Sequence, residues 1–148
     1  MNTILLAVDL KPSDSELIRH ASAMAEKFQS KIWIIHIAAP APDFVGYRVG
    51  PTYIREMRAE ELRKEHKELQ ELAAQLKEKS IDAEALLIQG PTIEMLKNEV
   101  ENLKIDLLIM GSHKRGFLFE MLVGPTSSVK VIKDIAIPVF IIPLPEWE

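Results

Sequence analysis

The sequence predicts an α/β fold: a three-layer α/β/α sandwich built on a five-stranded parallel sheet. Short apolar runs rich in branched residues alternate along the 148 residues with segments whose apolar residues recur at helical spacing. An uninterrupted apolar run is typical of a strand buried on both faces. Alternation of such strands with helices favours parallel strands joined by right-handed crossovers. No repeat and no linker divides the chain, which predicts a single domain over residues 1–148.

The first half of the chain contributes two predicted strands and two predicted helices. The strands cover residues 4–8 and 32–37. Between them, Ser13-Asp14-Ser15-Glu16 has the form of a capping box, so we expect Ser13 to cap a helix whose apolar face extends to Phe28. Residues 38–52 hold three prolines, two glycines and no apolar period, which is typical of a functional loop. A helix with one apolar and one charged, solvated face is expected over residues 53–79.

The second half contributes three more strands, expected at residues 82–88, 105–110 and 138–142, and helices that begin near Thr92 and Thr126. The strand at 105–110 is a buried apolar run, and the glycine-bearing loop Gly111-Ser112-His113-Lys114-Arg115-Gly116 follows it. The last strand, also an apolar run, is expected at an edge of the sheet. An uncovered edge strand invites pairing with another chain.

Composition excludes several classes of function. The formal net charge is only −4, which disfavours nucleic acid or an anionic membrane as a main partner. The chain has no cysteine, so disulfides, thiolate metal sites and cysteine nucleophiles are excluded. The first residues lack a basic region, and no apolar run approaches the roughly 20 residues that span a bilayer. We therefore expect a cytoplasmic protein.

A ligand crevice is expected where the strand order reverses. If the order is the common 3-2-1-4-5, the reversal falls between the first and the fourth strand, and ligands bind outside the carboxyl ends of those strands. Asp9 follows the first strand, Gly111 follows the fourth, and Ile37 ends the second. Free backbone N–H groups and a helix dipole at such a place favour a phosphate group.

In these segments the chain resembles the universal stress protein family. The resemblance is carried by residues 4–9, His36-Ile37, residues 106–113 and residues 137–142. It implies a flavodoxin-like or Rossmann-like sheet in the order 3-2-1-4-5 and a homodimer paired through the last strand, from Val139 to Ile142. Some members of this family bind ATP or AMP, and others do not.

The nucleotide-binding members carry glycine, two residues, glycine, nine residues, glycine, then serine or threonine. Gly111 and Gly124 fit the first and third glycines, whereas Lys114 and Pro125 depart from the pattern. Lys114 brings a side chain into space that glycine leaves open, although its charge could attract phosphate. Pro125 lacks an N–H, and one charge-assisted hydrogen bond is worth roughly 1.5–3 kcal/mol. Alternatively, Pro125 is simply a favourable first residue of a helix.

The resemblance implies that adenine meets Asp9 and the Ile37 backbone, and that phosphates meet residues 111–114 and 124–127. Magnesium is expected only if bound to the nucleotide. The predicted contact residues are Ala7, Val8, Asp9, Ile37, Met110, Gly111, His113, Lys114, Gly124, Thr126 and Ser127.

Several single residues have alternative interpretations. Asp9 is equally consistent with a cap of the strand-to-helix turn. His113 is also consistent with an exposed loop histidine. We expect His36 to be a core histidine, and His20 and His66 to lie at the surface. No two histidines have the spacing of metal ligands.

Three functional hypotheses remain open. The first is a dimeric stress-response module that binds ATP or AMP without turnover. The second is a nucleotide-independent dimer that acts through protein partners, with a relic site closed by Lys114 and Pro125. The third is a slow ATP hydrolase, for which the sequence offers no positioned base or metal and hence no catalytic residue. Phe44, Tyr47 and Tyr53 are assigned either to a lid over the crevice or to a dimer surface.

Overall fold

The computed structural model describes residues 2–38, 52–89, 93–111 and 135–144. Within them, five strands form one parallel sheet in the order β3-β2-β1-β4-β5, which confirms the predicted fold class and strand order. The predicted helix over residues 126–133 lies outside the described residues. In chain order the elements are β1 (Thr3–Ala7), α1 (Asp14–Phe28), β2 (Lys31–Ala38), α2 (Thr52–Glu78), β3 (Ala83–Gln89), α3 (Ile93–Asn102), β4 (Leu107–Gly111) and β5 (Val139–Ile142).

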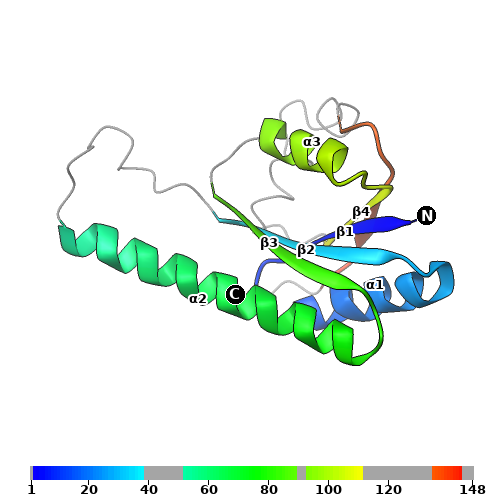
Figure 1. Ribbon diagram of the computed structural model, residues 1–148, viewed down its shortest axis with the longest axis horizontal. Helices are drawn as coiled ribbons and strands as arrows, with labels where there is room; N and C mark the ends of the chain where they lie inside the picture. Colours follow the sequence, from blue (N-terminus) through cyan, green and yellow to red (C-terminus); the bar gives the residue numbers. More distant parts are fainter. Residues whose placement is uncertain (1, 39–51, 90–92, 112–134, 145–148) are drawn as a thin grey trace.

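Helices cover both faces of the sheet. Helices α1 and α2 lie on one face and α3 lies on the other (Figure 1). Successive strand residues alternate between two apolar clusters, as the period of a strand requires. In β1, Ile4 and Leu6 pack with the α1 and α2 side chains, whereas Leu5 packs with Leu96 and Val100 of α3. The sheet is therefore the middle layer of the expected sandwich.

Strand β1 is the central strand of the sheet, and its carboxyl end lies at the candidate site. In the register of the sheet, Leu6 is paired with Ile34 of β2 on one side and with Ile109 of β4 on the other. Because all three strands are parallel, their carboxyl ends meet at one edge. The carboxyl-terminal residues of β1, β2 and β4 thus border a common region.

Two local predictions about α1 were wrong, whereas β5 lies at an edge of the sheet as predicted. Ser13 has helical backbone angles and makes no side-chain cap hydrogen bond, while Glu16 pairs with Arg19 at 2.8 Å, so the capping box does not form. Phe28, expected on the buried face of α1, is 51% exposed because it lies in the last turn of the helix. Strand β5 is only partly buried: Phe140 and Ile141 are 40% and 36% exposed.

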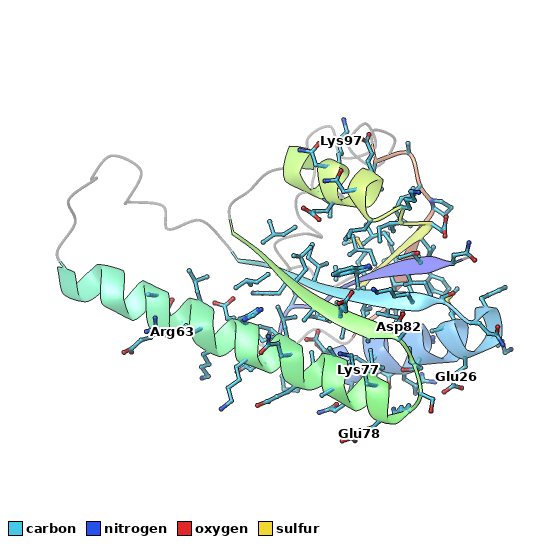
Figure 2. All side chains as sticks on the ribbon, in the orientation of Figure 1. Glu26, Arg63, Lys77, Glu78, Asp82 and Lys97 are labelled. Carbon is cyan, nitrogen blue, oxygen red and sulfur yellow. The ribbon has the colours of Figure 1, made fainter. Side chains whose placement is uncertain are left out.

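The charged face of α2 is solvated, as predicted. Leu69, Ala73 and Leu76 are buried against the sheet. Arg63, Lys77 and Glu78 are exposed, and Figure 2 labels them along α2. The other strand and helix boundaries agree with the predicted ones within two residues.

Candidate functional site at the carboxyl edge of the sheet

The carboxyl end of β1 is firmly joined to β2. Ala7 ends the strand, yet the Val8 N–H still donates to the Ile35 carbonyl at 2.9 Å, so the ladder continues one residue further. Val8 is 3% exposed and belongs to the core on the α1 side. Asp9 is therefore the first residue to leave the sheet, and it is half-buried.

The loop from Asp9 to Ser13 is closed by the side chain of Asp14, the first residue of α1. Asp14 Oδ1 accepts the N–H of Asp9 at 3.2 Å, and Oδ2 accepts the N–H of Lys11 at 3.1 Å. The backbone of Leu10, between these donors, has a φ of 60°. A left-handed conformation is unfavourable for a leucine, so the two hydrogen bonds hold a strained turn in place.

Asp14 is buried at this turn, with 5% exposure. Burial raises the pKa of its carboxyl, the hydrogen bonds from the Asp9 and Lys11 backbone oppose that rise, and the negative charge of Asp9 adds to it. The influence of Asp9 means that two carboxylates share one short loop. Such a pair concentrates negative charge at the end of β1.

His36 of β2 links this edge of the sheet to α2. Its Nδ1 lies 3.0 Å from the Val8 carbonyl oxygen, and its Nε2 lies 2.7 Å from Oε2 of Glu65. The two side chains are 15% and 23% exposed. A carbonyl can only accept, so Nδ1 donates to Val8, while the Glu65 carboxylate lies within ion-pair distance of Nε2. His36 is mostly buried, as expected for a core histidine, but it is held by polar groups rather than by apolar packing alone.

The carboxyl end of β4 is held by packing. Met110 is 2% exposed and packs on the α3 side. A Cβ added to Gly111 would lie 2.3 Å from Leu144 Cδ1 and 3.6 Å from Leu17 Cδ2. Leu144 follows β5 and is buried. The space beside Gly111 is thus filled by the protein itself, which gives this glycine a structural reason independent of any ligand.

The structure brings together only part of the predicted site. Ala7, Val8 and Asp9 lie at the end of β1, Ile37 lies in β2, and Met110 and Gly111 end β4. The side chain of Ile37 is not described. The remaining predicted contacts lie outside the described residues: His113, Lys114, Gly124, Thr126 and Ser127. The same holds for Pro125, Phe44 and Tyr47, and the side chain of Tyr53 is not described either.

Two residues at this edge were missed by the sequence reasoning. Asp14 was assigned only to the middle of a capping box, and Glu65 only to a solvated helix face. A signal for Asp14 exists: aspartate next to the first turn of a helix is well suited to accept free N–H groups. No comparable signal exists for Glu65, because its contact with His36 depends on how α2 crosses the sheet.

Other described regions provide weaker candidates for a functional site. A groove between α1 and α2 begins at the β1–α1 loop, where Leu10 and Asp14 line it, and extends along the two helices past Ser22 and Leu72. Within the described ranges, no group of three or more histidine, aspartate or glutamate side chains is placed to hold a metal ion. In that same part of the chain, no helix is long and apolar enough to cross a membrane. His20 is half-exposed and His66 exposed.

Comparison with known proteins agrees with this fold. The universal stress protein YxiE of Bacillus subtilis is 25% identical over 146 residues, which cover 95% of this chain and 98% of that protein. A universal stress protein family protein of Arabidopsis thaliana, solved with AMP bound, has a TM-score of 0.60 at 20% identity, covering 97% of this chain and 92% of its own. A universal stress protein solved in complex with cAMP has a TM-score of 0.63 at 19% identity, covering 95% and 96%. At these identities the two structures establish the fold alone. The model of the universal stress protein family matches residues 1–143, and the chain therefore belongs to that family.

Proposed function

We propose that this chain is a binding module that takes an adenine nucleotide, ATP or AMP, at the carboxyl ends of β1 and β4. The observation that supports it most is the pairing of β1 with β4 at the reversal of the strand order. At such a switch point the loops after two neighbouring strands diverge to opposite faces and leave room for a ligand. The AMP and cAMP bound by related proteins of the same fold support the choice of ligand class.

In this proposal the β1 rim receives the nucleoside. The Asp9 carboxylate accepts hydrogen bonds from the adenine amino group or the ribose hydroxyls, and the backbone at Ile37 borders the base. The phosphates are assigned to the segments 111–114 and 124–127, where Lys114 would supply charge in place of a close backbone approach. No step of turnover is included, because binding alone requires only these contacts.

Isothermal titration with ATP and with AMP tests the proposal. We expect measurable heat and a rise in melting temperature, because a ligand that binds only the folded state stabilises it. Asp9→Asn removes the carboxylate charge and should weaken binding by roughly tenfold or more, as loss of one charge-assisted hydrogen bond does.

Asp82→Asn is the matched control for Asp9→Asn. Asp82 is exposed and directly precedes β3, at the opposite end of the parallel sheet. It makes the same charge change, and we expect it to leave affinity unchanged. Neither heat nor a melting shift with the wild-type chain at millimolar nucleotide would rule out the proposed function.

We further propose that two copies of the chain pair through β5. This strand is the last in the sheet order, and Phe140 and Ile141 leave a considerable apolar area in contact with solvent. Phe140 lies on the α1 side, where its ring centroid is 6.4 Å from that of His20, and Ile141 points to the opposite face. Contact with a second copy would cover both side chains.

Light scattering coupled to gel filtration tests the dimer. Ile141→Asp should convert the dimer to a monomer, because it places a charge on the edge strand. Phe28→Asp is the control, since Phe28 is a still more exposed apolar residue on α1 rather than on an edge strand. A wild-type monomer, or a dimer that persists in Ile141→Asp, would contradict pairing through β5.

A nucleotide-independent protein-interaction dimer is the second candidate. One observation favours it: packing against Leu144 accounts for Gly111 without any phosphate. The same titration separates the two candidates, because the second requires a stable dimer that takes up no nucleotide.

A further inference from the structure

We propose that Asp14 is the positioning residue of this site: its ionised carboxylate fixes the β1–α1 turn in the form that presents Asp9 to the ligand. The inference rests on the proposed function and deepens it, since it names a residue that acts on the nucleoside through Asp9 without touching it. Neither the family motif nor the crevice argument includes Asp14.

The first support is the direction of the contacts. Asp14 accepts the N–H groups of Asp9 and Lys11 through different oxygens, and its own N–H donates to the Lys11 carbonyl at 2.9 Å. An ordinary helix cap accepts N–H groups of its own first turn. Asp14 instead faces backwards along the chain, toward the residue that follows β1. Its side chain therefore shapes the loop and not the helix.

The second support is the strain that these contacts maintain. Leu10 adopts a φ of 60° between the two N–H donors. Strained backbone of this kind persists only where surrounding contacts over-determine it, and it is often part of a binding site. Without the carboxylate, Leu10 would relax toward an ordinary conformation. The peptide on its amino-terminal side carries Asp9, so that relaxation would rotate the Asp9 side chain away from its present position.

The third support is that a neutral side chain at position 14 would give a higher free energy of unfolding than the ionised carboxylate does. Burial raises the pKa of Asp14, so the folded chain binds a proton more readily than the unfolded chain does. Ionised Asp14 therefore lowers the free energy of unfolding above its folded-state pKa, and that penalty disappears as the pH falls through this pKa. A buried charge kept at a cost to stability is a common property of functional sites.

The experiment compares Asp14→Asn with Glu16→Gln. Glu16 lies in the same first turn but is exposed and paired with Arg19, so the control makes the same charge change at the same helix end. Asparagine keeps one acceptor and turns an amide group toward the second N–H. Relief of the buried charge and loss of that bond oppose each other, so we expect little change in melting temperature. Affinity for AMP should fall by about tenfold or more, while Glu16→Gln keeps wild-type affinity.

The pH profile gives a readout that a purely structural role would not change. Wild-type affinity should fall as acid protonates Asp14, and Asp14→Asn should lack that component while Glu16→Gln retains it. Other ionisable groups near Asp14 are present in all three proteins, and of these Asp9 is coupled to Asp14 by its charge. They are Asp9 and Lys11 of the loop, Arg19 and Glu26 of α1, and Glu68, Glu71 and Lys79 across the groove. An Asp14→Asn affinity within about twofold of wild type would overturn the inference.

Amide hydrogen exchange keeps the test decisive in two further cases. If Asp14→Asn does not fold, Asp14→Ser, which retains one acceptor, replaces it. If the wild-type chain binds no nucleotide, the proposed function is wrong, and exchange alone decides what Asp14 does. Slow exchange of the Asp9 and Lys11 amides in the wild type, lost in the variant, supports a loop held by Asp14. Exchange at the rate of an unstructured peptide overturns it.

Discussion

Replacing Gly111 by alanine tests whether this glycine is required by packing. The new Cβ would lie 2.3 Å from Leu144 Cδ1, whereas ordinary contacts begin near 3.4 Å, so the methyl group must move by about 1 Å. The obstacle is the end of one side chain and not backbone, which limits the strain. Overpacking of this kind costs about 1–3 kcal/mol, and we expect a value in the lower half of that range.

A double-mutant cycle separates this clash from other effects of the alanine. Leu144→Ala alone removes a buried leucine side chain and should cost about 2–3 kcal/mol. In that background the methyl group introduced by Gly111→Ala enters space that Leu144 has left, so the second substitution should cost almost nothing. The expected coupling is therefore about 1–2 kcal/mol in favour of the double variant. Urea unfolding followed by circular dichroism measures all four proteins.

If the cost of the double variant equals the sum of the two single costs within about 0.5 kcal/mol, the packing argument is refuted. The double variant has a second use. Since its stability is close to that of Leu144→Ala, nucleotide titration of this pair shows whether Gly111 also matters for phosphate. A loss of affinity only when residue 111 is alanine would assign the glycine a second role in binding.

Three further predictions concern the described residues. Glu65→Gln should lower the free energy of unfolding by about 1–2 kcal/mol, because it removes the carboxylate beside the mostly buried His36 ring. In a His36→Ala background the same substitution should have little further effect. Equal effects in both backgrounds, measured by urea unfolding, would contradict the pairing. Hydrogen bonds from the Asn2 and Thr3 backbone lower the pKa of Asp106, so its contribution to stability is present above the pKa of the unfolded chain and is lost as the pH falls through the folded-state pKa. Asp106→Asn should therefore lower the melting temperature at neutral pH and match the wild type in strong acid, and a pH-independent difference would exclude this cause. Each described helix is followed by a non-glycine residue with positive φ, and these residues are Gln29, Ser80 and Lys104. Glycine at each position should raise the free energy of unfolding by about 0.5–1 kcal/mol, measured by thermal unfolding. A lower melting temperature would show that the native side chain contributes more than the strain costs.

The fold was predictable because its signals are local and repeated. Each apolar run is long enough for a strand and too short for a helix, and each helix has its own apolar face. The strand order needed two additional elements, the handedness of crossovers and the family resemblance. Boundaries differed by one or two residues because ladder bonds extend past the assigned strands, as the Val8 N–H does at the end of β1.

The details of the site were less predictable, for physical reasons. The four residues from Ser13 to Glu16 satisfy the capping-box pattern. In the structure, however, the Asp14 carboxylate accepts backbone N–H groups of the preceding loop, and Glu16 pairs with Arg19 one turn away. Local pattern cannot decide between such competing hydrogen bonds. Glu65 and His36 are 29 positions apart, and only the path of α2 across the sheet brings them together.

The two rims of the candidate site are built on different physical principles, and this separates what mutations there should do. The β4 rim is held by apolar packing around Gly111, where substitutions change the free energy of unfolding first. The β1 rim is held by hydrogen bonds to polar side chains, Asp14 at the loop and His36 at the Val8 carbonyl. Such contacts fix direction, because a hydrogen bond has a preferred geometry and an apolar contact does not. A chain that only needed to fold could close both rims with apolar side chains. The placement of the directional contacts beside Asp9 therefore supports the proposal that the β1 rim binds a ligand.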